Sequence, residues 1–270
     1  MVVFPNAKIN LGLNVIEKRS DGFHNIETVF YPINLCDILE IVKSQNNESA
    51  LFNSGIIINS NTNNNLCIKA LNLIKKYFSL PEVDIFLHKN IPFGAGLGGG
   101  SSDAAKVLSV LNLMFCLNIG DEKLMHYAAE LGSDCAFFIK NKPQQASGRG
   151  EIMSDIDVDL SGYYFVLAKP NIFVNTADAY TAIKPQKPEI RISEIISLPV
   201  EKWKYLLKND FEDVIFKIFP QIKALKEKFY SCGAVYASMS GSGSSVYGFF
   251  DRAVDVSDFE KDCFVFTEHL

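Results

Sequence analysis

The stretch Ile91-Pro92-Phe93-Gly94-Ala95-Gly96-Leu97-Gly98-Gly99-Gly100-Ser101-Ser102-Asp103 holds five of the 17 glycines in this 270-residue chain. It follows a strand-like run at residues 83–87 and precedes apolar residues that recur at helical spacing from Ala105 onward. Glycine lets the backbone approach a ligand closely, and the N-terminus of a helix carries N–H groups without intrahelical partners. The stretch therefore predicts an anion cradle, most naturally for phosphates, with Ser101 capping a helix that starts where the glycines end.

The familiar phosphate-binding motifs do not fit this stretch. A Walker A loop requires lysine directly after its last glycine, whereas Ser101 follows Gly100. Gly94, Gly96 and Gly99 formally satisfy GxGxxG, but the sequence about 20 residues further on lacks the strand with an acidic residue that a dinucleotide-binding fold needs. No HRD or DFG motif of the protein kinases accompanies the glycines. The structural alternative is a flexible loop without a ligand, which the adjoining helix pattern disfavours.

The N-terminal half of the sequence mixes strands and helices. Residues 7–15 alternate between apolar and polar types, which predicts a half-buried strand with Lys8 and Asn10 on its polar face. An asparagine-capped helix is expected at residues 66–77, and a second one, ended by a glycine, at residues 121–131. Further strands are expected at residues 26–31, 38–42, 55–58 and 83–87.

The C-terminal part of the sequence predicts a ferredoxin-like arrangement. A strand is expected at residues 163–168, followed by helices, two strands at AVYASMS and SVYGFF, and a last strand at CFVFT. Two central strands flanked by helices and outer strands indicate a split βαβ unit. Residues 184–199 contain three prolines and predict an irregular connection. We therefore expect an α+β protein with one domain at residues 1–155 and another at residues 156–270.

Composition and charge disfavour several classes of protein. Hydrophobic residues make up 48% of the chain and charged residues 21%, which excludes wholesale disorder. The formal net charge is −5 and no long basic run is present, so we expect no nucleic-acid partner. No apolar stretch reaches the ~18 residues of a membrane span and no signal peptide is evident, so we expect no membrane partner and a cytoplasmic location. The six cysteines have no CxxC or Cys/His spacing, which disfavours structural zinc and disulfides.

Three motifs in order resemble those of the GHMP kinases, the family of galactokinase, homoserine kinase and mevalonate kinase. PFGAGLGGGSSDAA at residues 92–105 is similar to the second family motif, PxGxGLGSSAA. PNAKINLGLNV at residues 5–15 resembles the first motif and SMSGSGSSVYGFF at residues 238–250 the third. The resemblance implies a two-domain α+β fold, with an N-terminal domain like the second domain of ribosomal protein S5 and a ferredoxin-like C-terminal domain. It also implies ATP-dependent phosphorylation of an alcohol.

The resemblance further implies which residues take part in catalysis and ATP binding. Asp134 lies in LGSDCAFFI, which is similar to the GADVPFF segment of the family, and would accept the proton of the reacting hydroxyl. Lys8 would lie beside Asp134 and favour its ionised form, as a neighbouring positive charge does. Ser101 and Ser102 lie where a hydroxyl could bind phosphate or the Mg²⁺ that would accompany ATP, and no second protein ligand for the metal is evident. The residues expected to bind ATP are Pro92, Phe93, Gly94, Ala95, Gly96, Leu97, Gly98, Gly99, Gly100, Ser101 and Ser102.

A fourth segment indicates the kind of alcohol. EKRSDGFHNIETVF at residues 17–30 resembles the RxDGYHxLxT signature of the family members whose substrate carries a cytidine diphosphate. Carried over, this implies that Phe23 stacks on the cytosine, His24 contacts its edge and Tyr180 closes the opposite face. Phe23 stands where tyrosine is usual, and Cys135-Ala136 stand where Val-Pro is usual. Further substrate contacts are expected from Asn10, Thr176, Gly241 and Ser242.

Three other interpretations stay open at this point. The chain is alternatively a GHMP kinase for another small alcohol, such as homoserine or mevalonate, in which Phe23 and His24 would not affect substrate binding. An RNA-binding module with an S5-like fold is a second alternative, which the net charge of −5 disfavours. A catalytically inactive sensor that keeps the nucleotide loop is the third, and the presence of Lys8, Asn10 and Asp134 disfavours it. The sequence leaves open whether the protein is a monomer or a homodimer.

Overall fold

The computed structural model describes residues 1–56 and 65–270, which divide into two compact units. The first unit comprises Met1–Lys8, Pro32–Phe93 and Gly98–Lys142, and the second comprises Ile9–Tyr31, Gly94–Leu97 and Pro143–Leu270. Both units are therefore built from discontinuous segments, and the glycine stretch contributes residues to each. The expected domain boundary after residue 155 stays a prediction, because a division by contacts does not test a division along the sequence.

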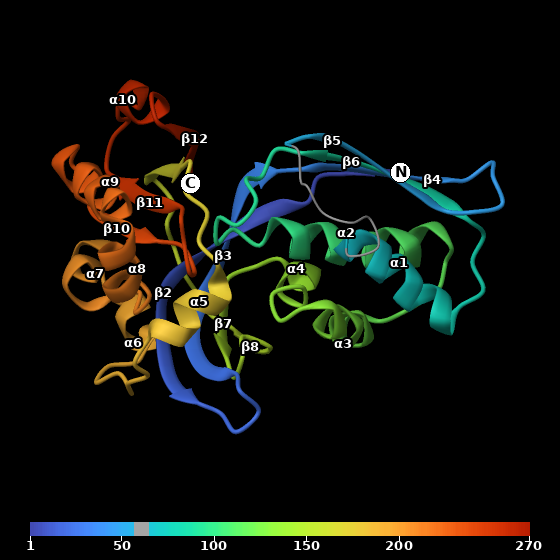
Figure 1. Ribbon diagram of the computed structural model, residues 1–270, viewed down its shortest axis with the longest axis horizontal. Helices are drawn as coiled ribbons and strands as arrows, with labels where there is room; N and C mark the ends of the chain where they lie inside the picture. Colours follow the sequence, from blue (N-terminus) through green and yellow to red (C-terminus); the bar gives the residue numbers. More distant parts are fainter. Residues whose placement is uncertain (57–64) are drawn as a thin grey trace. The chain divides into compact units, whose positions relative to one another are not determined.

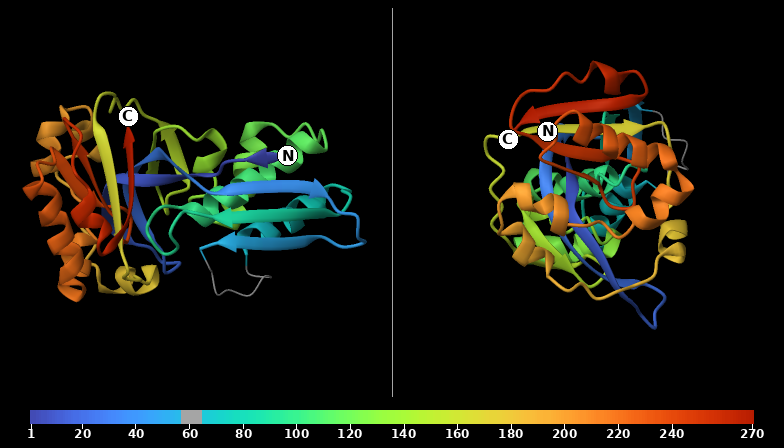
Figure 2. Two further views of the ribbon diagram at one scale, coloured as in Figure 1. Left: turned by 90° about the horizontal axis from the view of Figure 1, so that it is seen from above. Right: turned by 90° about the vertical axis from the view of Figure 1, so that its left-hand side faces the viewer.

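The first unit is a sheet covered by helices. Its strands are β1 (Val2–Val3), β4 (Ile38–Lys43), β6 (Val83–Lys89) and β5 (Ala50–Gly55), in the order β1-β4-β6-β5. Figure 2 shows these strands side by side, and β5 is the one that runs parallel to its neighbour β6. Helices α1 (Leu66–Tyr77) and α2 (Gly99–Met114) lie on one face of the sheet (Figure 1). The remaining helices of this unit are α3 (Asp121–Leu131) and α4 (Phe137–Lys140).

The second unit contains two sheets. One has the order β2-β3-β7-β8 and the other the order β10-β11-β9-β12. Their strands are β2 (Asn6–Lys18), β3 (His24–Cys36), β7 (Gln144–Ser147), β8 (Ile152–Asp155), β9 (Tyr164–Pro170), β10 (Tyr236–Met239), β11 (Val246–Phe250) and β12 (Cys263–His269). The helices are α5 (Thr176–Ala182), α6 (Ile192–Ile196), α7 (Val200–Leu206), α8 (Glu212–Ile218), α9 (Pro220–Ser231) and α10 (Ser257–Glu260).

The strand order of the second sheet confirms the ferredoxin-like prediction. The first strand of this region along the chain, β9, lies between the third, β11, and the last, β12. All neighbouring strands are antiparallel, and helices connect β9 to β10 and β11 to β12, which is the split βαβ pattern. The core beneath is aromatic, since Phe229, Phe250 and Phe259 are each at most 1% exposed. In the described residues, no helix is long and apolar enough to span a membrane.

Most expected elements are confirmed, with ends shifted by a few residues. The first strand extends to Lys18, and Asn65 caps α1 by accepting a hydrogen bond from the N–H of Cys67 at 2.8 Å. Of the strand expected at residues 55–58, Gly55 lies in β5 and Ile56 lies in a bend, while residues 57 and 58 lie outside the described residues. This edge strand is largely exposed, so it has no apolar alternation to reveal it. Within residues 184–199, a short helix, α6, interrupts the expected irregular connection.

The start of α2 also differs from the prediction. The helix begins at Gly99, two residues before Ser101, and its N-cap is Gly98 in the left-handed conformation with no capping side chain. The residue at this first helical position packs closely against Ile91, which lies two residues after β6. A Cβ atom built at Gly99 would lie 2.9 Å from Cγ2 of Ile91, a residue that is 1% exposed. Glycine is therefore required inside the helix at this position, although it disfavours helices elsewhere.

Two adjacent glycines of α2 provide a test of this packing. Gly99→Ala is expected to destabilise the protein by about 1–3 kcal/mol, because the new methyl overlaps a branched, buried side chain. Gly100→Ala is the matched control, since the nearest atom to its Cβ, Cδ1 of Leu66, would be 3.8 Å away. It is expected to stabilise the helix by about 0.5–1 kcal/mol. Chemical denaturation of both variants checks this, and equal effects would contradict the packing argument.

Candidate functional site

The two residues expected in catalysis lie together in the first unit. The Nζ atom of Lys8 is 3.4 Å from Oδ2 of Asp134, and the lysine side chain is 4% exposed whereas the aspartate side chain is 34% exposed. Gly98 makes room for the lysine, because a Cβ there would lie 3.2 Å from Cε of Lys8 and 3.0 Å from Cζ of Phe138. The ion pair therefore lies next to the start of α2, with a carboxylate that remains accessible.

The first turn of α2 presents groups suited to an anion. The leading N–H groups of any helix lack intrahelical partners and form its positive end. Ser102 is 0% exposed, and within residues 1–56 and 65–270 its Oγ atom has no hydrogen-bond partner. Leaving a buried hydroxyl unpaired costs free energy, so this atom calls for a bound oxygen. The side chain of Ser101, in contrast, already has a partner, because it interacts with the thiol of Cys135. Burial raises the pKa of this thiol to about 12.

A buried charge cluster fixes both ends of the glycine stretch. The ammonium of Lys89, in β6, forms an ion pair with Asp37 and another, at 2.6 Å, with Oδ2 of Asp103 in α2. The other oxygen of Asp37, Oδ1, accepts hydrogen bonds from the N–H groups of Asn90 and Ile91 at 2.7 and 2.8 Å. The cluster thus joins the residues before the glycines to the helix after them.

Burial sets the protonation behaviour of this cluster. It raises the pKa of Asp103 to about 7, because desolvation and the neighbouring Asp37 oppose its charge more than Lys89 favours it. The two carboxylates raise the pKa of Lys89 despite its burial. Sequence reasoning missed the cluster, since Lys89 lies 52 residues from Asp37 and 14 residues from Asp103, and the three share no motif spacing.

In the second unit, the glycine stretch contacts the loop of the third motif, residues 238–245. Ser240 donates a hydrogen bond from Oγ to the carbonyl of Gly96 at 2.9 Å. A Cβ atom at Gly96, whose φ is +74°, would lie 2.0 Å from the carbonyl oxygen of Ser240. A backbone approach this close excludes every residue with a side chain. Gly94 is similarly constrained, because its Cβ would lie 2.6 Å from the ring of Phe173.

Three of the expected substrate residues adjoin this third-motif loop. Thr176, the first residue of α5, and Ser242 share a hydrogen bond of 2.9 Å between their hydroxyl groups. Asn10 is 2% exposed and donates from Nδ2 to Oγ1 of Thr28 at 2.9 Å, while its carbonyl accepts from the hydroxyl of Tyr247 at 2.7 Å. These hydrogen bonds fix the position of Asn10 in β2.

The aromatic residues expected at the cytosine lie on the second unit as well. The rings of His24 and Tyr180 are stacked, with centroids 5.1 Å apart and planes 20° apart. Phe23 is 54% exposed, and the guanidinium of Arg149 lies 4.9 Å from its ring centroid. Partial burial and the charge of Lys18 lower the pKa of His24, so the imidazole is neutral near pH 7. The sequence did not put Arg149 forward, because its contact with Phe23 joins residues 126 positions apart.

Comparison with known proteins finds relatives along the entire chain. Residues 65–142 match the family model "GHMP kinases N terminal domain" and residues 200–261 match "GHMP kinases C terminal". The chain is 53% identical over 274 residues to 4-diphosphocytidyl-2-C-methyl-D-erythritol kinase of Bacteroides fragilis, with 100% of both chains covered. It is 46% identical over 272 residues to the kinase of the same name from Parabacteroides distasonis, again with 100% of both covered.

Solved structures give the same result. The fold is similar to a crystal structure of 4-(cytidine 5'-diphospho)-2C-methyl-D-erythritol kinase, with a TM-score of 0.84 and 29% identity, covering 99% of this chain and 98% of that one. A crystal structure of mevalonate kinase has a TM-score of 0.74 at 14% identity, covering 99% and 98%, and shows likeness of fold alone.

The charge cluster yields a prediction about stability. Both carboxylate oxygens of Asp37 accept hydrogen bonds, one from Lys89 and the other from backbone N–H groups. The amide of Asp37→Asn must therefore turn its N–H groups toward one of these donors. We expect the free energy of unfolding to fall by about 3–5 kcal/mol. Asp103→Asn is the matched control: Oδ1 of Asp103 has no hydrogen-bond partner in the described part of the chain, so the amide can keep its oxygen on Lys89. A change within about 1 kcal/mol is expected there, since the substitution also removes a buried negative charge. Urea denaturation at pH 8 decides, and similar losses in both variants would refute the unequal roles.

Proposed function

Because this chain belongs to the GHMP kinase family, we propose that it transfers the γ-phosphate of ATP to the C2 hydroxyl of 4-diphosphocytidyl-2-C-methyl-D-erythritol. This reaction belongs to the non-mevalonate route to isoprenoid precursors. The observation that carries the proposal is the full-length identity of 46–53% to relatives that bear the name of this kinase. A cytoplasmic location stays a prediction, and monomer or homodimer stays open.

In the proposed phosphate site, backbone N–H groups bind the phosphates more than charged side chains do. The N–H groups at Gly99, Gly100 and Ser101 stand at the positive end of α2, where a triphosphate is stabilised without a lysine. The orphaned hydroxyl of Ser102 fits either a phosphate oxygen or a metal ion that prefers hard oxygen ligands. Mg²⁺ bound with ATP would supply neutralisation of the phosphate charges, and Ser102 is the residue we propose to hold it.

Asp134 and Lys8 are proposed to act on the acceptor. The accessible carboxylate of Asp134 receives the proton of the C2 hydroxyl as that oxygen forms its bond to the γ-phosphorus and ADP departs. Lys8 holds the carboxylate from its buried side, 3.4 Å away, and keeps it turned toward the same place throughout the reaction. Phosphoryl transfer has a loose transition state, so orientation of the hydroxyl contributes along with proton removal.

The cytidine part of the substrate is proposed to bind at the aromatic residues. Tyr180 and Phe23 offer ring faces for the base, and neutral His24 has one donor and one acceptor nitrogen for its edge. Thr176 and Ser242 offer hydroxyl groups for the diphosphate. The same set of residues has no evident role for a kinase that acts on homoserine or mevalonate, since neither of those alcohols carries a base.

The proton-accepting role of Asp134 is tested by substitution. Asp134→Asn preserves shape but cannot accept the proton, so kcat is expected to fall about 10²- to 10⁴-fold with little change in KM for either substrate. Asp121→Asn, at the exposed start of α3, is the control and should leave kcat unchanged. Steady-state kinetics measures both. A kcat for Asp134→Asn within threefold of the unmodified protein would exclude the proposed role.

The choice of substrate is tested at Tyr180. Tyr180→Ala removes one stacking face, so KM for the cytidine substrate is expected to rise about 5- to 100-fold while KM for ATP stays the same. Tyr205→Ala, at a tyrosine that is 72% exposed in α7, is the matched control. In parallel, methylerythritol phosphate without the cytidine group should be a poor substrate. Equal turnover of the truncated alcohol would rule out the proposed substrate.

A further inference from the structure

The segment of residues 208–212, which follows α7 and ends at the first residue of α8, is bonded to the first motif of the chain. Leu13 of β2 donates its N–H to the carbonyl of Lys208 at 2.9 Å and accepts from the N–H of Asp210 at 2.8 Å. The carboxylate of Asp210 accepts a further hydrogen bond from the N–H of Val15 at 2.8 Å. These three bonds give the short segment a fixed place on β2.

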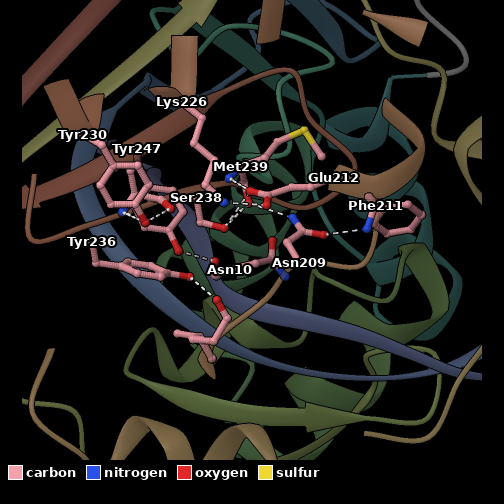
Figure 3. A network of polar contacts seen from close by, with 12 residues as sticks. Asn10, Asn209, Phe211, Glu212, Lys226, Tyr230, Tyr236, Ser238, Met239 and Tyr247 are labelled. Atoms are coloured by element: carbon pink, nitrogen blue, oxygen red, sulfur yellow. Dashed lines mark hydrogen bonds and ion pairs between the residues drawn. The ribbon is translucent and has the colours of Figure 1, made fainter. Parts of the chain in front are cut away.

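Asn209, in the middle of this segment, uses its whole side-chain amide. The residue is 3% exposed, and its Nδ2 atom donates to the carbonyl groups of Met239 at 2.7 Å and Gly241 at 2.8 Å. Its Oδ1 atom accepts from the N–H of Phe211 at 3.0 Å. Figure 3 shows the amide between the third-motif loop and Phe211, with Glu212 bonding the N–H of Met239 from the same segment. The side chain of Asn209 thus orients both the third-motif loop and the backbone of Phe211.

Phe211 extends this connection to the aromatic residues. It is 1% exposed, and its ring meets that of Tyr180 edge-on, with centroids 4.8 Å apart and planes 89° apart. Tyr180 is in turn stacked on His24. An edge-to-face contact of this kind fixes the plane of a ring as well as its distance. The orientation of Tyr180 therefore depends on a residue that does not itself reach the proposed base.

The contacts close into a ring around α5. Asn209 holds Gly241, the neighbouring Ser242 bonds Thr176 at the start of α5, and Tyr180 near the end of α5 packs on Phe211, which bonds back to Asn209. This seven-residue helix is too short to be stable alone, so tertiary contacts set its place: the contacts at its two ends and the burial of Ala179 in the core. The contact of Thr176 with Ser242 and the contact of Tyr180 with Phe211 are both connected to the side-chain amide of Asn209.

We propose that Asn209 and Phe211 are positioning residues for the substrate: they orient α5 so that Tyr180 faces the base while Thr176 faces the diphosphate. The proposal rests on the proposed function, because it takes a cytidine diphosphate group as the ligand. It predicts that loss of the Phe211 ring weakens binding of the cytidine substrate and leaves the phosphate donor and the chemical step unaffected. A merely structural role would lower stability without that selectivity.

The experiment compares Phe211→Leu with Phe259→Leu. Phe259 is also 1% exposed and lies in the same apolar core, against Phe229, so its loss gives a matched reduction of a buried ring. Binding of cytidine 5'-diphosphate is measured by calorimetry, and KM for both substrates and kcat by steady-state kinetics. Phe211→Leu is expected to raise the Kd of cytidine 5'-diphosphate and KM of the cytidine substrate about 5- to 20-fold, the lower part of the range for one stacked base, because the Tyr180 ring is misoriented and not removed. Its kcat and KM for ATP should stay within threefold, and Phe259→Leu should change none of these constants.

Asn209→Asp adds a second variant, because a carboxylate keeps the size of the amide but cannot donate to Met239 or Gly241. It should shift the same two constants in the same direction. If it fails to fold, Phe211→Leu alone decides. An unchanged Kd in Phe211→Leu, or an equal rise in Phe259→Leu, overturns the positioning role. Failure of the unmodified protein to bind cytidine 5'-diphosphate would instead count against the proposed function itself.

Discussion

Exclusion of a side chain at a few glycines is the constraint on which the local structure depends. At Gly96 a Cβ would lie 2.0 Å from a carbonyl oxygen, and at Gly99 it would lie 2.9 Å from a branched side chain. At Gly98 the space that a side chain would fill holds the stem of Lys8. In each unit taken separately, these three glycines therefore leave little or no room for a side chain. The same closeness is what a phosphate needs in order to meet backbone N–H groups.

Positive charge is used sparingly in this arrangement. The chain has a net charge of −5, and Lys8 and Lys89, the two buried lysines, both face carboxylates. In the proposed function, attraction for the triphosphate therefore comes from the N-terminus of α2 and its dipole. Lys89 instead joins Asp37, which bonds the backbone before the glycines, to Asp103 in the helix after them. An acidic protein can in this way hold an anion that its net charge would repel.

Local signals in the sequence predicted those features that depend on local structure. The strand at β2, the asparagine cap of α1 and the strand pattern of the ferredoxin-like sheet each arise within a few residues, and each is confirmed. The expectation that β2 is half-buried is wrong, because residues 6–15 are buried on both faces, with Lys8 3% and Asn10 2% exposed. The family motifs also put Lys8 and Asp134 forward as a pair, and the two lie 3.4 Å apart. The start of α2 was misplaced because a serine is a good cap in general, whereas here packing against Ile91 sets the first turn.

Features that depend on distant contacts could not be predicted in this way. Asn209 lies 30 and 32 residues from the two carbonyl groups it bonds, and an asparagine before an aspartate suggests only a turn. Phe211 belongs to an ordinary apolar pattern, and only its edge contact with Tyr180 distinguishes it from other buried rings. Such residues affect binding through the residues that touch the ligand, so substitution data limited to direct contacts would not detect them. Kinases of this fold act on different alcohols. A short helix such as α5, oriented by residues that do not touch the ligand, permits the substrate site to differ between them while the phosphate loop stays the same.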